Sequence, residues 1–234
     1  MLSQTEENYL KAIFKTEERT AGAAANTNAI AAALETTPAS VTDMLKRLSE
    51  KRLIHYEKYK GVTLTTQGGE CAKMLVRKHR LWEVFLVEKL HYRWDQVHDL
   101  AEQLEHIQSE DLIDRLDYFL GTPRFDPHGD PIPDAKGIFI QREQILLSEL
   151  ENHQEGIVVG VYEHAPAFLK QLDALKIALG TTIKIIDRYE FDHSLKIVIN
   201  TKETALISQK VSKSIFVTAT SVAASPYHQS KISK

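Results

Sequence analysis

The sequence predicts a mainly α-helical protein in three parts: an N-terminal winged helix-turn-helix, a helical middle domain and a small C-terminal SH3-like β-barrel. Amphipathic helical segments dominate the first half of the chain, and a pair of short β-type runs interrupts them once. A stretch rich in proline and glycine follows, after which the chain turns to short β-type runs. A length of 234 residues suits two or three small domains rather than one.

The first part of the chain has the element order of a winged helix-turn-helix. Apolar residues at helical spacing predict a helix over Thr5–Glu18, a short helix over Asn28–Leu34 and a third over Ser40–Lys51. Two β-type runs follow, Leu53–Tyr56 and Val62–Thr65, and the polar segment with a glycine between them predicts a hairpin. Helices, turn and hairpin in this order are typical of the winged helix.

Three further helical segments are expected in the middle of the chain. A long helix is predicted over Gln67–Leu90 and a second over Trp94–Ile107. The third, Asp111–Leu120, is amphipathic, and its apolar residues suit a core or a dimer interface. Proline and glycine dominate Pro123–Pro133, which excludes regular structure there and places a domain boundary in or just after this stretch.

From Gly156 onward, several short β-type runs surround one helix-like segment that begins at Pro166. Such a density of short strands predicts a small barrel of the SH3-like kind. The polar end of the chain is expected to be disordered. The predicted divisions are a winged helix over 1–66, a helical domain over 67–140, a linker over 141–155, a barrel over 156–218 and a disordered tail over 219–234.

Composition restricts the location and the chemistry. The start lacks the pattern of a secretory signal and no apolar run is long enough for a membrane span, so a cytoplasmic protein without a membrane partner is expected. A single cysteine, Cys71, excludes a disulfide framework and a multi-thiolate zinc site. The net charge is −3, but Asp43–Arg80 holds ten lysines or arginines against four acidic residues. A solvated helix face and a nucleic-acid surface both fit such a charge run.

Side chains that bind metals gather between His79 and His106. His79 and Glu83 are four residues apart, and His98, Glu102, Glu105 and His106 fall at i, i+4, i+7 and i+8, which predicts one face of a single helix. Packed together, the two faces would form a cage of imidazoles and carboxylates, which suits Mn²⁺, Fe²⁺, Co²⁺ or Zn²⁺. A lone helical histidine is more often a core residue, but six histidines and glutamates at these spacings favour a metal site.

Taken together, these segments resemble the family of the diphtheria toxin repressor and the manganese transport regulator. The resemblance rests on the opening TEENYLKAIF, the run SVTDMLKRLSEKRLIHYEKYKGVTLTTQG, the stretches RKHRLWEVFL and VHDLAEQLEHIQSE, and the linker PHGDPIP; it extends from Glu6 to about Val217. It implies a homodimeric transcriptional repressor, not an enzyme, that binds palindromic double-stranded operator DNA of metal-uptake genes when Mn²⁺ or Fe²⁺ loads it. It also implies a middle domain for dimerisation and metal binding, and no small-molecule substrate.

The resemblance further implies two metal ions per subunit and assigns their ligands. Asn8, Glu102, Glu105 and His106 correspond to one site, and His79, Glu83 and His98, with Glu163 from the barrel, correspond to the other. Glu102 stands where iron-type members carry a cysteine, and this harder oxygen donor favours Mn²⁺ over Fe²⁺. Asn8 stands where the manganese branch has an aspartate, so one negative charge is missing. Its neighbour Glu7, about 100° away around the helix, is expected to face solvent.

The residues expected to contact DNA lie at the start of the third predicted helix and on the wing. Serine and threonine at a helix N-terminus suit phosphate contact, although the cap is an equally good role for Thr37. Asp43 either accepts a hydrogen bond from a cytosine amine or faces away from the bases. The predicted contacts are Thr37, Ala39, Ser40, Thr42, Asp43, Lys46, Arg47, Lys58 and Lys60.

Metal binding is expected to join the first helix to the metal-binding helices and so fix two DNA-reading heads at a set spacing. Without metal, the carboxylates of Glu83, Glu102 and Glu105 are expected to be unpaired and to repel one another. Two other functions fit part of the pattern. One is a metallohydrolase built on the same cage, although no Gly-rich loop or spare base supports it. The other is a winged-helix regulator that answers a non-metal effector and keeps its metal site for structure.

Overall fold

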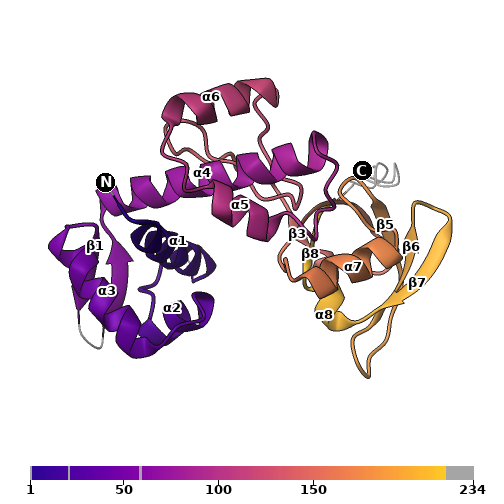
Figure 1. Ribbon diagram of the computed structural model, residues 1–234. Coiled ribbons are helices and arrows are strands. Elements are labelled where there is room, and N and C mark those ends of the chain that lie inside the picture. The colour runs from indigo at the N-terminus through magenta and orange to yellow at the C-terminus, as the bar shows by residue number, and fades with distance from the viewer. Residues whose placement is uncertain (1, 21, 58–59, 220–234) are drawn as a thin grey trace, which may run out of the picture. The chain divides into compact units, whose positions relative to one another are not determined.

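In the computed structural model, the chain folds into two compact units (Figure 1). The first holds the residues up to Asp126 together with Pro131–Ile140, and the second holds Pro127–Asp130 and the chain from Gln141 onward. The structure describes residues 2–20, 22–57 and 60–219. Apart from Ala219, which ends the last strand, the predicted disordered tail lies outside the described residues.

The first unit begins with the predicted winged helix. Its elements are α1 (Gln4–Arg19), α2 (Thr27–Ala33), α3 (Pro38–Glu50) and the hairpin of β1 (Ile54–Glu57) and β2 (Gly61–Leu64), all within two residues of expectation. Ser3 and Glu6 form a capping box that starts α1. Thr37 caps α3, with Pro38 in its first turn. These local signals explain why the element boundaries follow the sequence pattern closely.

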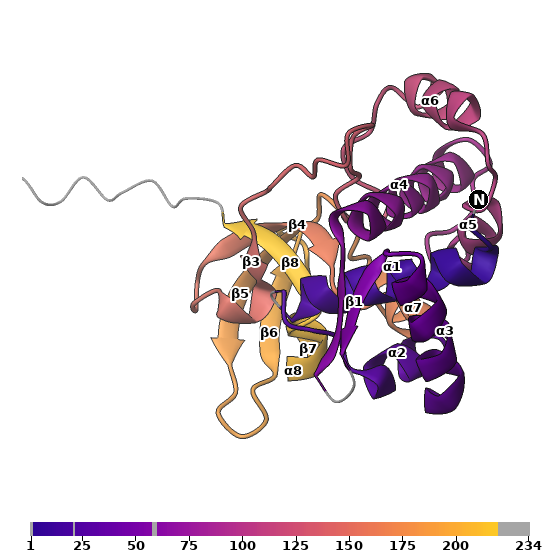
Figure 2. The ribbon, with the colours of Figure 1, turned by 90° about the vertical axis from the view of Figure 1, so that its left-hand side faces the viewer.

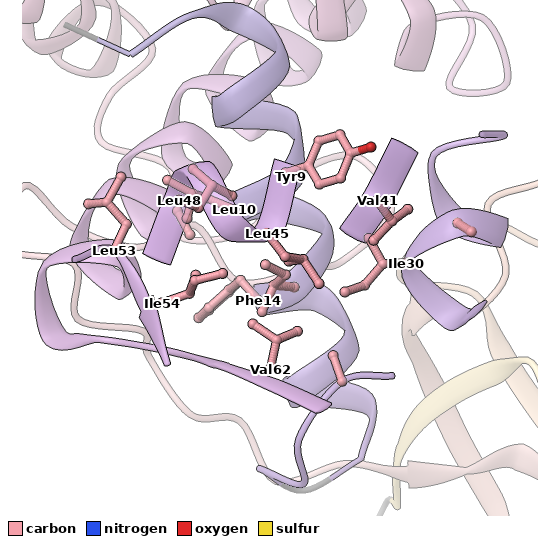
Figure 3. Packing of buried hydrophobic residues seen from close by; sticks show 14 of the residues in the cluster. Tyr9, Leu10, Phe14, Ile30, Val41, Leu45, Leu48, Leu53, Ile54 and Val62 are labelled. Carbon is pink, nitrogen blue, oxygen red and sulfur yellow. The ribbon is translucent and has the colours of Figure 1, made fainter. Parts of the chain in front are cut away.

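The three helices and the hairpin enclose one apolar core (Figure 3). Leu10 and Phe14 of α1 are buried there with Ile30 of α2, Leu45 of α3 and Val62 of β2. On α3 the buried residues recur every three or four positions, which gives this helix a single apolar face. On α1 every residue from Tyr9 to Phe14 is buried, because this helix also packs against the helix that follows the hairpin. The shared core fixes α1 against α3, so that a shift of one helix is felt by the other.

Three more helices complete the first unit. The long helix α4 (Thr66–Glu88) has α1 and α5 (His98–Leu104) on one side and α6 (Glu110–Phe119) on the other, as Figures 1 and 2 show. A β-carbon on Gly68 would come within 1.9 Å of the Leu53 carbonyl oxygen, so glycine lets α4 start directly against the winged helix. None of the helices in the described part of the chain is both long and apolar enough to cross a membrane.

The helix expected over Trp94–Ile107 is shorter than predicted, because α5 ends at Leu104 and has Glu105 as its C-cap. Before α5, the Arg93 guanidinium pairs with the buried Asp95 at 2.9 Å, and the side chain of Gln96 accepts a hydrogen bond from the Arg93 amide. These local bonds compete with helix formation and hold a turn. His106 therefore lies beyond the helix, and the prediction that all four donors share one helix face is wrong.

The second unit is an antiparallel sheet with short helices. Its elements are β3 (Ile145–Leu146), the 3-10 helix η1 (Leu147–Glu149), β4 (Glu155–Val161), α7 (Pro166–Ala174), β5 (Thr182–Arg188), β6 (Leu195–Ile199), β7 (Glu203–Ile207), α8 (Gln209–Ser212) and β8 (Ile215–Ala219). Six strands follow the order β3-β8-β4-β5-β6-β7. The predicted strands and the predicted helix are present, and β3 and η1 lie in the stretch 141–155, where a linker was expected.

A closed barrel is not seen in this sheet. β3 and β7 stand at its two edges, and within the described residues no strand pairing joins them. The register shifts between Val158 and Gly160 on β4 and between Ile185 and Asp187 on β5. Such irregularities bend and twist strands. The C-terminal part is therefore a curved, open β-sheet rather than the closed barrel that the strand density predicted.

Candidate metal centre

The predicted cage lies where α5 packs on α4, inside the first unit. His79 and Glu83 are one turn apart on α4 and are almost completely buried, with 4% and 2% of their surface exposed. His98 comes from the first turn of α5, and its ring centroid lies 5.0 Å from that of His79. Donor atoms of His79, Glu83 and His98 all lie within 4.8 Å of one another. This set is called the histidine cluster below.

His79 also belongs to a second group of donors. Its Nδ1 shares a hydrogen bond of 2.6 Å with Glu105, while its Nε2 faces Glu83 at 3.1 Å. Donor atoms of His79, Glu102 and Glu105 lie within 4.8 Å of one another, and this set is called the carboxylate cluster. One buried imidazole therefore joins two adjoining donor sets through its two ring nitrogens.

The carboxylate cluster already holds a positive charge, the ammonium group of Lys11 on α1. Lys11 Nζ donates to both carboxylate oxygens of Glu105, at 2.9 and 2.6 Å, and to Glu102 at 3.1 Å. It also lies 3.3 Å from His79 Nδ1. The expectation of unpaired, mutually repelling glutamates is therefore wrong, since Lys11 pairs with two of them and His79 bonds the third, Glu83. Charge spacing along α4 and α5 could not reveal this, because the lysine comes from α1, which is far away in sequence.

These contacts shift the pKa values of the clusters. Burial by itself raises the pKa of Glu105, but the hydrogen bond with His79 and the charge of Lys11 outweigh it and lower the pKa. The pKa of Glu102 is lowered against its burial in the same way, chiefly by Lys11. Burial lowers the pKa of His79, but the carboxylates of Glu83 and Glu105 outweigh burial and raise it. Near neutral pH, both glutamates therefore present charged oxygens.

Asn8 and His106 line a surface hollow beside the carboxylate cluster. The hollow has a volume of about 480 Å³, and Asn8, Glu102 and His106 form its wall together with Gln4, Asp99 and Gln103. His106 Nε2 lies 3.9 Å from Glu105. Three of the four residues expected for one metal site thus line this hollow, and the buried Glu105 lies behind it beside His106. The four do not converge on a common point as closely as either cluster does.

Glu7 does not face solvent, which corrects the expectation. Its side chain is only 13% exposed, and its two carboxylate oxygens bond His106 Nδ1 at 2.6 Å and Gln108 Nε2 at 2.7 Å. Because α5 ends early, the chain after it runs alongside α1 and brings His106 and Gln108 to Glu7. A helical projection of α1 alone cannot show a partner of this kind. Glu7 orients the His106 ring and ties α1 to the end of α5.

A further carboxylate, Asp126, was not predicted as part of the site. It is buried, with 4% exposed, and its oxygens reach within 4.8 Å of those of Glu83. The Arg80 guanidinium lies 3.7 Å from Asp126 and offsets part of its charge. Asp126 stands in the proline- and glycine-rich stretch that the sequence pattern marked only as irregular. The available signal was an acidic residue directly before Pro127 in this stretch.

The second unit carries its own donor residues, including the predicted ligand Glu163. Glu163 is half-buried after β4, and its Oε1 accepts a hydrogen bond from the amide of Ala165. In the same unit the buried His128 stacks on His164, with ring centroids 4.6 Å apart. Sequence reasoning singled out neither histidine, since each stands alone in a loop. The role of Glu163 as a metal ligand stays a prediction.

The residues predicted to contact DNA lie mostly on the exposed start of α3. Thr37 is the N-cap, since its hydroxyl accepts from the Ser40 amide at 3.2 Å, and Thr42 Oγ1 donates to the Pro38 carbonyl. Asp43 and Lys46 form an exposed ion pair. Lys58 lies outside the described residues. The exposed members of the set are Thr37, Ala39, Ser40, Asp43, Lys46, Arg47 and Lys60. A role in DNA contact stays a prediction for all nine.

The donor chemistry of the two clusters fits a divalent ion of the first transition series. Imidazole nitrogens and carboxylate oxygens are suitable ligands for Mn²⁺ and Fe²⁺, and neither cluster contains the thiolate that softer ions prefer. The carboxylate cluster binds a cation in this structure, namely the Lys11 ammonium. The carboxylate cluster is therefore suited to hold a positively charged ion.

Comparison with protein families matches the chain in three consecutive segments. Residues 1–62 match the N-terminal DNA-binding domain of iron-dependent repressors, and residues 65–134 match the metal-binding and dimerisation domain of the same family. Residues 145–219 match the FeoA domain. The matches follow the order of the winged helix, the helical part and the open sheet.

Individual relatives agree with these matches. The iron-dependent repressor IdeR of Mycobacterium leprae is 36% identical over 132 residues, which cover 56% of each protein, so the chain aligns with little more than half of that relative. The regulator MntR of Oceanobacillus iheyensis is 36% identical over 110 residues, or 47% of this chain and 73% of that protein. A solved manganese-dependent transcriptional repressor in complex with manganese is 32% identical, with a TM-score of 0.82 over 92% of this chain and 99% of that one.

Proposed function

Because the chain belongs to the family of iron-dependent repressors, we propose that it is a metal-activated transcriptional repressor that binds palindromic operators of metal-uptake genes as a homodimer. The position of α1 carries this proposal. The same helix contributes Leu10 and Phe14 to the winged-helix core and places Glu7, Asn8 and Lys11 against the donor residues around α5. A change in what α1 contacts at the metal centre therefore reaches α3 through a shared core.

We infer two metal positions, one at the histidine cluster and one at the carboxylate cluster and its hollow. His79, Glu83 and His98 would hold the first, and Glu102, Glu105, His106 and the Asn8 amide oxygen would hold the second. A bound divalent ion would supply the positive charge that draws these donors together. Glu7 orients the His106 ring, and His79 couples the two positions through its two nitrogens.

The donors of this site suit Mn²⁺ better than Fe²⁺. Glu102 supplies a hard oxygen donor at the position where iron-type relatives, by the resemblance, carry a thiolate. The solved structure with a TM-score of 0.82 is named as a manganese-dependent repressor in complex with manganese. Affinity alone favours later transition metals over Mn²⁺, so the arrangement of the donors has to discriminate between them.

A homodimer is supported by exposed apolar side chains after α4 and at the end of α6. Leu90, Tyr118 and Phe119 are 52%, 84% and 63% exposed, and Lys89 Nζ lies 5.6 Å from the Phe119 ring, so the two helix ends adjoin. Neighbouring exposed apolar side chains are typical of an interface. A twofold-symmetric dimer would present two α3 helices to successive turns of the major groove, and the operator would be palindromic for the same reason. Lys46 and Arg47 on α3 would then contact phosphates.

For the C-terminal unit we propose an SH3-like domain in which Glu163 is a metal ligand. The support is the resemblance of the segment around Glu163 to the donating segment of the family, together with its carboxylate chemistry. Glu163→Ala should lower the Mn²⁺ affinity of one of two sites without changing DNA affinity in the absence of metal. Unchanged metal affinity and stoichiometry would remove this unit from the metal site.

The direct test is selection of genomic DNA fragments by the purified protein in Mn²⁺, in Fe²⁺ without oxygen, and in EDTA. Recovery of palindromic fragments only with metal is expected, and the better ion identifies the effector. Equal recovery in EDTA would favour a non-metal effector with a structural metal site. Because coupling is reciprocal, operator DNA should also tighten metal binding by the factor with which metal tightens DNA binding. An identical metal affinity with and without operator would exclude the mechanism.

A further inference from the structure

We propose that Lys11 is a tethered cation that occupies the carboxylate cluster in the metal-free protein and has to leave before a divalent ion binds there. This rests on the proposed function, in which the carboxylate cluster holds a metal ion. The consequence is a repressor whose own lysine competes with its effector. Lys11 would then set the metal concentration at which this site fills.

The contacts of Lys11 are those of a bound ion rather than of a surface lysine. Its ammonium has three neighbours among the residues of the carboxylate cluster, with the shortest distance 2.6 Å to Glu105. Only 4% of Lys11 is exposed, and the Glu105 side chain is completely buried. A buried ammonium is costly unless nearby negative charges offset the loss of hydration, and here two carboxylates do so. Lys11 thus satisfies the same oxygens that a divalent ion would use.

Lysine is suited to leave this position. Its charge sits on a flexible four-carbon chain, and it binds as a point charge without the fixed geometry of arginine. A hollow of about 580 Å³ opens beside it, and Lys11, His98 and Glu102 are among the residues that line this hollow. The ammonium can therefore swing from the cluster into water without a movement of α1. A divalent ion carries twice its charge, so the exchange favours the metal once the metal is abundant.

The exchange would alter the contacts of α1. With Lys11 in the cluster, α1 is tied to Glu102 and Glu105 by its own ammonium. With Lys11 displaced, that tie is lost, and the links of α1 to this region pass through Asn8 and the Glu7–His106 pair. Glu7 and Asn8 lie on the first turns of α1, one turn before Lys11. The metal-free and metal-loaded forms would thus hold α1 at different points, which is the kind of two-state contact that allosteric coupling needs.

Calorimetric Mn²⁺ titration of the full chain tests the proposal with variants that remove the charge. Lys11→Leu and Lys11→Met keep an apolar stem of similar length, and each should bind Mn²⁺ at one site about tenfold more tightly than the wild type. The matched control is Lys15→Leu, which removes the same charge one turn further along α1 and should leave the affinity within about twofold. Thermal melting in EDTA and in Mn²⁺ shows whether each variant is folded.

A second measurement uses the unaltered protein, in case both variants fail to fold. Amine acetylation followed by mass spectrometry reports the accessibility of each lysine, and the labelling of Lys11 should rise several-fold in Mn²⁺ relative to EDTA. Lys46, exposed on α3, serves as the internal reference. Wild-type protein that binds Mn²⁺ with unchanged Lys11 labelling, and Lys11 variants of unchanged affinity, would overturn this inference and leave the proposed function intact. If neither the wild type nor the variants bind Mn²⁺, the proposed function itself is wrong.

Discussion

The two donor clusters share His79 but differ in how their negative charge is balanced. In the histidine cluster Glu83 lies against two imidazoles, and the charge of the buried His79 is lost as the pH rises through its raised pKa. The carboxylate cluster balances Glu102 and Glu105 with the ammonium of Lys11, whose ion pairs with the two carboxylates offset its loss of hydration. Two sets of donors with similar chemistry therefore differ in their metal-free stability and in what a metal ion has to replace.

The largest effect that this difference predicts is on the stability of the metal-free protein. Glu105→Ala should lower the free energy of unfolding in EDTA by about 3 kcal/mol, because the buried Lys11 ammonium loses its main partner. The double variant Glu105→Ala with Lys11→Leu should recover more than half of that loss, since neither charge is then left alone. Urea unfolding in EDTA measures both. Strictly additive losses would show that the two residues are not coupled and that the clusters do not differ in this way.

For the histidine cluster, the loss of a carboxylate should have a small effect on stability and a large effect on metal binding. Glu83→Gln should cost about 1 kcal/mol in EDTA, because the buried His79 can lose a proton instead of remaining charged, and the His98 side chain is half-exposed to water. The same change should lower Mn²⁺ affinity at one site by at least about tenfold, since an anionic donor is replaced by a neutral one.

The control for Glu83→Gln is Glu88→Gln, which removes the same charge at an exposed position further along α4. It should change neither the unfolding free energy nor the Mn²⁺ affinity measurably. A stability loss for Glu83→Gln as large as that for Glu105→Ala would contradict the contrast between the two clusters.

How far the sequence anticipates this site depends on whether a contact is local. The spacings of His79, Glu83 and His98 on helices were enough to predict a shared cluster, and caps such as Thr37 fixed helix starts. The length of α5 was mispredicted, because the side-chain bonds around Arg93 and Gln96 override a helical pattern. The pairing of Lys11 with Glu105 and the approach of Asp126 to Glu83 were not predictable from spacing. Spacing carries no information on which helix or loop packs against which face.

The same contrast should be visible in the pH dependence of metal-free stability. The pKa of Glu105 is lowered from its ordinary value of 4.5, so its stabilising contribution is present above pH 4.5 and is lost as the pH falls through the lowered value. The pKa of His79 is raised from 6.5, so its contribution is complete below pH 6.5 and is lost as the pH rises through the raised value.

Lys11→Leu should reduce the loss of unfolding free energy on acidification by about 1 kcal/mol, because the ammonium no longer lowers the pKa of Glu105. It should move the loss of stability at alkaline pH to higher pH, since the Lys11 charge that lowers the pKa of His79 is gone while the carboxylates that raise it remain. Urea unfolding in EDTA at several pH values records both changes. If wild type and variant lose the same unfolding free energy on acidification, Lys11 does not control the charge of the carboxylate cluster.

The smallest predicted effect concerns the outer wall of the carboxylate cluster, where Asn8 brings a neutral oxygen. Asn8→Asp should tighten Mn²⁺ binding at one site only about threefold, because Asn8 lines a hollow that is open to solvent and the added charge is screened there. Gln4→Glu adds the same charge to the same hollow and is the matched control. An equal gain from both variants would mean that the hollow only attracts cations, whereas a gain confined to Asn8→Asp would make position 8 a ligand. In the second case, the metal-loaded protein ties α1 to the centre through position 8, one turn before the lysine that ties it in the metal-free form.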